Sequence, residues 1–245
     1  MMKKVILLIF TILFSTSPVF AWGIPRCGNN VPYPGKEYEE LIKNHNAFYI
    51  GDTNKKEVYL TFDTGYELGN TSVILDILRS ENVKAAFFVT GHFLKQNKEL
   101  VLRMYNEGHL VCNHTWNHPN ITKKSKIEIE EDLCRVEDKY YEITHDYMPK
   151  FLRPPEGAIS DYSLSVTDEL GYTTIFWSLA YVDWKINEQK GSKYAYDNVI
   201  NNIHNGAIIL MHTVSTDNRD ALKEIIATLR VNYEFKNLYD LVISL

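Results

Sequence analysis

The stretch "VYLTFD" (58–63) is the first of six short runs that decide the fold of this 245-residue chain. In it, five apolar, aromatic or β-branched residues precede a single carboxylate. The other runs are "AAFFVT" (85–90), "HLVCNH" (109–114), "KFLRPP" (150–155), "TTIFWSLA" (173–180) and "AIILMH" (207–212). Each run is rich in β-branched or aromatic residues, which predicts a short strand.

Helical patterns separate these runs. The sequence predicts helices at 71–79, 98–107, 126–141, 163–169, 194–204 and 220–230, and a shorter one near 38–45. Alternation of strands and helices predicts a mainly parallel sheet that is covered by helices. Strands with almost no polar positions fit a sheet that is buried on both faces. An (α/β) barrel and a doubly wound sheet both satisfy this pattern.

The first 21 residues have the pattern of a secretory signal peptide. Lys3 and Lys4 precede the apolar run 5–14, and Val19 and Ala21 occupy the small-residue positions before a cleavage site. The apolar run is shorter than the ~20 residues that span a bilayer, so a retained anchor is the alternative. We therefore expect a mature protein that acts outside the cytoplasm, has no stable membrane span and begins with a lead-in segment, residues 22–55.

Charge and cysteine content exclude several classes of protein. Removing residues 1–21, which contain two lysines and no acid, changes the formal net charge from −5 to −7. An acidic exported protein is a poor nucleic-acid binder, because phosphate contacts need a basic surface. The chain has three cysteines, too few for a disulfide scaffold. No feature indicates an obligate partner chain, and we expect a monomer.

Ionisable residues stand at the ends of the predicted strands. In both candidate architectures, function collects at the carboxyl ends of parallel strands. An apolar core does not tolerate such residues unpaired, so we expect them to form a site. They are Asp63, His114, Arg153, Asp183 and His212.

The pair His114 and His118 can converge on a divalent ion if the intervening chain begins a helical turn. The alternative is two surface histidines in a loop. Asp63 follows a strand and precedes Gly65, which allows a sharp turn close to a ligand. Its carboxylate can be a general base, a metal ligand or simply the start of a turn.

A histidine at the end of the last run completes a possible reaction site. His212 can protonate a leaving group near neutral pH, and Asp183 can orient its ring, with Trp184 as a wall beside it. Arg153 can hold Asp63 ionised or bind a substrate carboxylate. A buried structural histidine and a structural ion pair are the alternatives. Taken together, the residues favour metal-assisted hydrolysis of an amide.

Five ordered motifs resemble those of the polysaccharide deacetylases, the NodB-homology family of carbohydrate esterases (family 4). They are "TFDTGY" (61–66), "HTWNHP" (114–119), "RPPEG" (153–157), "VDW" (182–184) and "LMH" (210–212). The resemblance covers residues 56–245, which would form the catalytic domain. It implies a distorted (β/α) barrel of about seven parallel strands, a divalent metal ion, and removal of acetyl groups from N-acetylated sugars.

The resemblance also implies roles for single residues. Asp63 would be the base and a metal ligand, His114 and His118 the metal histidines, Arg153 the residue that orients the base, and His212 the acid tuned by Asp183. Substrate contacts would come from Tyr66, Trp184 and Arg153. Zinc is the expected metal, with magnesium, manganese or cobalt as alternatives. Thr64 and Ala180 stand where the family ordinarily has aspartates, which puts the identity and affinity of the metal in doubt.

The stretches "YLTFDTGYELG", "FFVTGHF", "FLRPPEG" and "FWSLAYVDWK" resemble the delta-lactam-biosynthetic de-N-acetylases. This resemblance implies a peptidoglycan substrate, N-acetylmuramic acid freed of its peptide, in the spore cortex. Three alternatives stay open: a deacetylase of N-acetylglucosamine, a non-catalytic glycan-binding module, and a glycosidase that uses Asp63 and Asp183 as its carboxylate pair.

Overall fold

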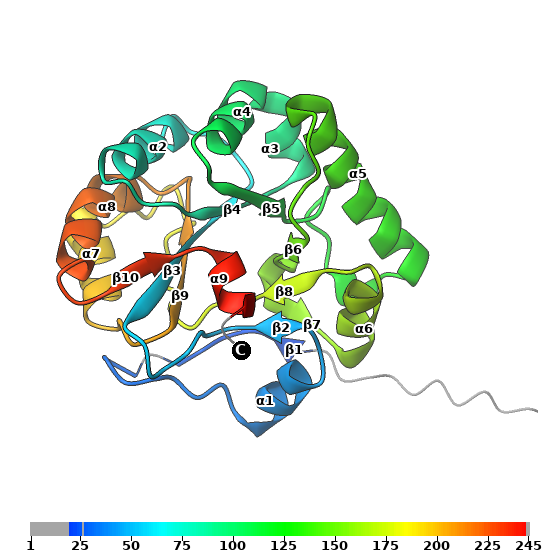
Figure 1. Ribbon diagram of the computed structural model, residues 1–245, viewed down its shortest axis with the longest axis horizontal. Coiled ribbons are helices and arrows are strands. Elements are labelled where there is room, and N and C mark those ends of the chain that lie inside the picture. The colour runs from blue at the N-terminus through cyan, green and yellow to red at the C-terminus, as the bar shows by residue number, and fades with distance from the viewer. Residues whose placement is uncertain (1–19, 26, 244–245) are drawn as a thin grey trace, which may run out of the picture.

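The computed structural model describes residues 20–25 and 27–243. Eight strands form one curved sheet in which every pairing is parallel (Figure 1). They are β2 (Ala47–Phe48), β3 (Glu57–Thr64), β4 (Ala86–Val89), β5 (Leu110–Asn113), β6 (Phe151–Leu152), β8 (Thr173–Ile175), β9 (Ala207–His212) and β10 (Glu234–Lys236). The predicted signal segment lies outside the described residues, apart from Phe20 and Ala21.

The sheet is curled into a distorted barrel. Seven strands follow one another in the order β9-β3-β4-β5-β6-β8-β2, and β10 pairs with the first residues of β3. A bridge from Leu179 to Ile209 in β9, and another from Ile50 to Ala207, bring the two sides of the sheet together. The expected barrel of about seven parallel strands is confirmed, and a flat doubly wound sheet is excluded.

Helices surround the barrel (Figure 1). They are α1 (Lys36–Lys43), α2 (Thr71–Ser80), α3 (Gly91–Gln96), α4 (Lys98–Asn106), α5 (Lys126–Thr144), α6 (Asp161–Glu169), α7 (Ser192–Ile200), α8 (Thr216–Leu229) and α9 (Leu238–Ile243). The sequence features that begin and end a helix are clear in α5. Ser125 and Glu128 form a capping box at its start, and His145 ends it in a left-handed conformation. None of the helices in the described residues is long and apolar enough to cross a membrane.

Two predicted strands are much shorter than expected. The run 150–155 is a strand only at Phe151–Leu152, because the prolines at 154 and 155 have no amide hydrogen to give to a neighbouring strand. The run 173–180 is a strand only to Ile175. After that the chain crosses to β9, where the amides of Ser178 and Leu179 both donate to the carbonyl of Ile208.

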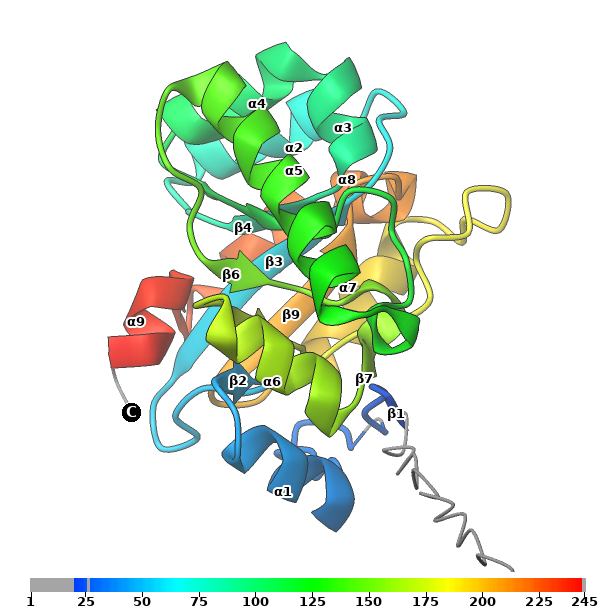
Figure 2. The same cartoon turned by 90° about the vertical axis from the view of Figure 1, so that its right-hand side faces the viewer.

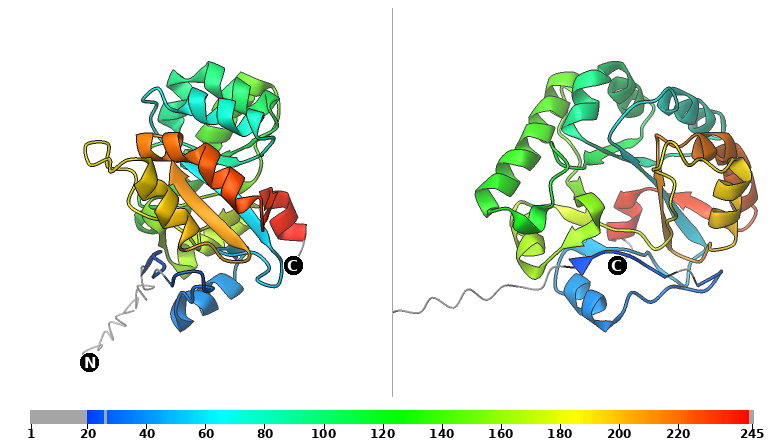
Figure 3. Two further views of the ribbon diagram at one scale, coloured as in Figure 1. Left: turned by 90° about the vertical axis from the view of Figure 1, so that its left-hand side faces the viewer. Right: turned by 180° about the vertical axis from the view of Figure 1, so that it is seen from behind.

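Several elements have no counterpart in the sequence analysis. Strand β2 comes from the predicted lead-in segment, and the short strands β1 (Phe20–Ala21) and β7 (Ala158–Ile159) pair with each other. Helix α9 lies at one end of the barrel, whereas the long connection between β8 and α7 projects at the opposite end (Figure 2). On one side of the barrel, α7 and α8 lie together over β9 (Figure 3). The parallel strands end at the side of the projecting connection, and the predicted site residues follow those ends.

Candidate active site

Strand register brings two of the predicted residues together. Strands β3 and β9 pair from Val58 to Asp63, so Asp63 lies directly beside His212. The amide of His114 donates to Val89 at 3.0 Å, which continues the ladder between β4 and β5 up to this histidine. The expectation that the strand ends form one site is therefore met for these residues.

Arg153 binds the Asp63 carboxylate from its buried side. Its side chain is completely buried, and Nη1 donates to Oδ1 of Asp63 at 2.8 Å. The other two nitrogens donate to the carbonyls of Ile175 and Phe176, each at 3.1 Å. Burial acts to raise the pKa of Asp63, but the charges of Arg153, His114 and His212 outweigh it and hold the pKa below its ordinary value. Asp63 is consequently an ionised carboxylate at neutral pH.

The two histidines of the "HTWNH" stretch converge through a loop, and the helical turn that the sequence analysis required between them is absent. Thr115 and His118 both have left-handed backbones, with φ of 66° and 53°. The Asp132 carboxylate in α5 accepts from the amide of Trp116 at 2.6 Å and holds the loop in place. As a result, the rings of His114 and His118 lie 5.0 Å apart between centroids.

The side chains of His114 and His118 fit two ligand positions of a divalent ion. Nδ1 of His114 donates to the carbonyl of Arg153 at 2.7 Å, which leaves Nε2 facing Asp63 Oδ2 at 3.6 Å. Burial lowers the pKa of His114 to about 4, so the ring is neutral and its lone pair is free for a metal. Among the described residues, however, no group of three or more histidine, cysteine or acidic side chains is arranged to hold a metal. Thr64 offers only a buried hydroxyl without a hydrogen-bond partner.

A second charged pair stands across from Asp63. Asp183 Oδ1 accepts from Nδ1 of His212 at 2.7 Å, and Oδ2 accepts from the backbone amide of His212 at 2.8 Å. Burial acts to lower the pKa of His212, but Asp183 and Asp63 outweigh it and raise the pKa above 6.5. The protonated form of His212 is therefore favoured relative to a free histidine, and its second nitrogen, Nε2, is not engaged by Asp183.

A groove of about 1250 Å³ contains Asp63, His114, His118 and His212. Its aromatic wall consists of Trp22, Tyr66, His92, Trp116, Trp177 and Trp184. Tyr66, His92 and Trp184 are its exposed members, with Tyr66 63% and Trp184 50% exposed, so these rings are accessible to a sugar. The Trp184 ring lies 5.5 Å from that of His212. Arg153, by contrast, is buried behind Asp63.

The sequence analysis missed several residues around this groove. Trp22 donates from Nε1 to the carbonyl of Trp177 at 2.9 Å and stacks on Phe176. Asn218 in α8 donates to Asp183 at 2.6 Å. The only signal for Asn218 was its place six residues after His212, just before the predicted helix 220–230. Glu156 lines the groove with a left-handed backbone, φ 58°, inside the "RPPEG" motif.

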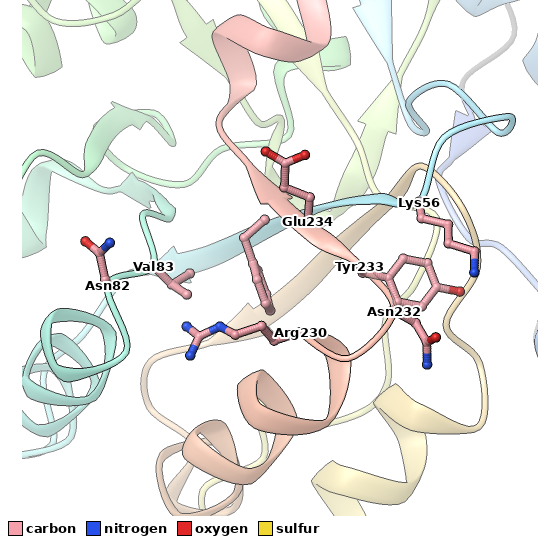
Figure 4. A pocket seen from close by; sticks show the side chains of 8 residues that line it. Lys56, Asn82, Val83, Arg230, Asn232, Tyr233 and Glu234 are labelled. Atoms are coloured by element: carbon pink, nitrogen blue, oxygen red, sulfur yellow. The ribbon is translucent and has the colours of Figure 1, made fainter.

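Another hollow, of about 500 Å³, lies where β3 begins, away from these residues (Figure 4). Lys56, Arg230 and Tyr233 are among the residues that line it. Arg230 pairs with Glu81 at 3.0 Å, and none of the predicted site residues reaches this hollow. The groove at the carboxyl ends of the strands is thus the candidate active site.

A family model described as polysaccharide deacetylase matches residues 50–175. The chain belongs to the polysaccharide deacetylase family. It is 48% identical to the peptidoglycan-N-acetylmuramic acid deacetylase PdaA of Bacillus subtilis over 90% of this chain and 85% of that protein. The solved structure of B. subtilis PdaA, a family 4 carbohydrate esterase, matches with a TM-score of 0.89 and 46% identity over 92% of this chain and 97% of that one.

A more distant relative is named for a different substrate. The peptidoglycan-N-acetylglucosamine deacetylase of Bacillus cereus is 37% identical over 77% of this chain and 69% of that protein. The protein described here is thus a hydrolase of N-acetyl amide bonds, and the family and fold that its motifs implied are both confirmed.

Proposed function

We propose that this polysaccharide deacetylase removes the acetyl group from N-acetylmuramic acid in peptidoglycan, before muramic delta-lactam forms in the spore cortex. The similarity to PdaA over nearly the whole chain supports the substrate. The observation that carries the chemistry is the pairing of Asp63 with Arg153 and of His212 with Asp183 across one groove. Such a protein works outside the cytoplasm, which agrees with residues 1–21 being a signal peptide.

The two pairs divide the proton transfers of amide hydrolysis between them. Asp63 takes a proton from the attacking water, whose oxygen bonds to the acetyl carbon. His212 gives its Nε2 proton to the sugar nitrogen as the carbon–nitrogen bond breaks, so that acetate and a free amine leave. Arg153 keeps Asp63 ionised, and Asp183 raises the pKa of His212 and so favours its protonated form before the reaction.

His114 and His118 would hold the divalent ion, which we expect to be zinc, with magnesium, manganese or cobalt as alternatives. When bound, the ion would polarise the acetyl carbonyl and acidify water. Because Thr64 brings no carboxylate, water or Asp63 would fill further ligand positions. Tyr66 and Trp184 would stack on the sugar rings at the exposed rim of the groove.

Two other functions have a specific observation in their favour. The B. cereus relative favours N-acetylglucosamine as the substrate. The buried, unpaired hydroxyl of Thr64, at a position where the family ordinarily has a metal-binding acid, favours a glycan-binding protein without activity. A glycosidase has no such support.

Mass spectrometry of purified peptidoglycan strands distinguishes these possibilities. Strands with and without stem peptides are incubated with the protein and Zn²⁺ or Mg²⁺, or with a chelator, and the Asp63→Asn variant serves as the inactive control. We expect loss of one acetyl group per muramic residue, on peptide-free strands and with metal only. Loss from glucosamine residues would replace the proposed substrate, and unchanged masses with every metal would leave glycan binding.

A further inference from the structure

We propose that Asn218 is a positioning residue that fixes the Asp183–His212 pair to the barrel. Asn218 is fully buried near the start of α8, where its backbone amide donates to the hydroxyl of Ser215. Its side chain contacts Asp183 but does not line the groove. The inference rests on the proposed catalytic role of His212 and Asp183.

Both hydrogens of the Asn218 side-chain nitrogen and its oxygen take part in this network. Nδ2 donates to Asp183 Oδ2 at 2.6 Å and to the carbonyl of His212 at 3.1 Å. Oδ1 accepts from the hydroxyl of Tyr181 at 2.5 Å. Because a backbone carbonyl can only accept, the nitrogen must face His212, and the orientation of the amide is fixed.

The Asp183 carboxylate receives three hydrogen bonds from the described residues, and two of them come from His212 itself. One of these two donors is the backbone amide of His212 at the end of β9, so a single strand holds Oδ2 of Asp183. Asn218 supplies a second donor to the same oxygen from a different element, α8, so that Oδ2 is held from two sides and the carboxylate cannot rotate about one bond. This bond keeps Asp183 Oδ1 directed at Nδ1 of His212, with the proton-donating nitrogen on the opposite side of the ring.

The groups around His212 come from three strand ends or connections: Asp63 from β3, Arg153 after β6, and Asp183 with Trp184 between β8 and α7. Asp183 contacts it directly, Asp63 lies beside it in the register, and Arg153 acts from behind Asp63. Trp184 supplies an uncharged wall. Asp63, Arg153 and Trp184 donate no hydrogen bond to the Asp183 carboxylate, whereas Asn218 does.

The test compares Asn218→Ala with Tyr181→Phe and with a matched control, Asn198→Ala. Asn198 is also a buried asparagine, but it lies in α7, where its side chain donates only to the backbone of Tyr194. For Asn218→Ala we expect kcat to fall by about tenfold with KM within about twofold, as for partners that orient a functional side chain. The downfield proton resonance of the His212 ring N–H bonded to Asp183 should disappear. Asn198→Ala should change thermal stability without changing kcat.

Tyr181→Phe removes only the hydroxyl that holds Asn218, so it should fold and lower kcat by a smaller factor in the same direction. This second variant keeps the proposal testable if Asn218→Ala does not fold. Wild-type kcat together with a retained downfield resonance in a folded Asn218→Ala protein would overturn the inference. The variant Asp183→Asn tests the role of the Asp183–His212 pair separately from that of Asn218. If Asp183→Asn keeps full activity, the proposed role of the pair is wrong. If it loses activity while Asn218→Ala does not, only the inference about Asn218 fails.

Discussion

Replacing Arg153 by methionine should strongly destabilise the protein, and the loss should depend on pH. Arg153 is 0% exposed, and methionine keeps most of its volume while removing the charge and all three hydrogen bonds. Removal of one partner of a buried ion pair costs about 3–5 kcal/mol, because the other charge stays buried without compensation. For a chain of this size, that loss corresponds to a fall in Tm of roughly 6–20 °C.

The sign of the pH dependence follows from the two opposing effects on Asp63. In the wild type its pKa lies below 3.8, so the carboxylate contributes stability above that pH and loses it as the pH falls through the folded-state pKa. In Arg153→Met, burial is no longer opposed by the guanidinium, and the pKa of Asp63 should rise above 3.8. The buried carboxylate then costs free energy at neutral pH, and protonation on acidification removes that cost. The stability difference between the two proteins should therefore shrink from pH 7 to pH 4.

Urea unfolding at pH 7 and pH 4.5, in a chelating buffer, measures both effects. The double variant Asp63→Asn/Arg153→Met should recover much of the lost stability, since it no longer buries an unpaired charge. Arg79→Met is the control, because the Arg79 pair with Asp76 is exposed and worth at most about 1 kcal/mol. Equal, pH-independent losses in the single and double variants would refute the reasoning.

Four further predictions concern the groove. His118→Ala should weaken zinc binding by at least about tenfold in calorimetry, and unchanged affinity would remove His118 from the metal site. Thr64→Asp should lower the Tm of the metal-free protein by burying a charge and regain it when zinc is added; failure of zinc to restore the Tm would contradict a metal next to this position. Gly91→Ala should cost about 1–3 kcal/mol in urea unfolding, because the new Cβ would meet the Trp116 ring at 2.2 Å, and wild-type stability would show that the loop is loosely packed. Trp184→Ala should raise KM by about 2–10-fold with little change in kcat, and an unaltered KM would exclude sugar stacking.

The gathering of Asp63, His114, Arg153 and His212 was predictable from sequence. Carboxyl ends of neighbouring parallel strands meet at one end of a barrel, so polar residues that follow such strands must come close together. The alternation of strands and helices was sufficient for this step, although the individual strands at 150–155 and 173–180 were overestimated. Prolines and a crossing chain shortened them without moving Arg153 away from Asp63.

Other parts of the site depend on contacts that local patterns do not encode. The convergence of His114 and His118 looked like a helical turn, yet it is produced by a loop that Asp132, 16 residues from Trp116, holds through the backbone. Trp22 lies 155 residues from Trp177 in sequence, and nothing in either neighbourhood indicates that they pair. Such contacts are set by how the helices and the lead-in segment pack on the barrel.

The protonation states that hydrolysis needs are the reverse of those that burial alone would give. Burial favours a neutral carboxylic acid and a neutral imidazole. A protonated Asp63 would be a poor base. A neutral His212 has a single N–H, and while Nδ1 donates it to Asp183, Nε2 has no proton to give. Arg153 and Asp183 each reverse the effect of burial on one partner, by charge and by hydrogen bonds. Buried ion pairs add little to stability when compared with apolar replacements of both partners. The presence of two such pairs on adjacent strands is therefore better explained by proton transfer in the groove than by the stability of the fold.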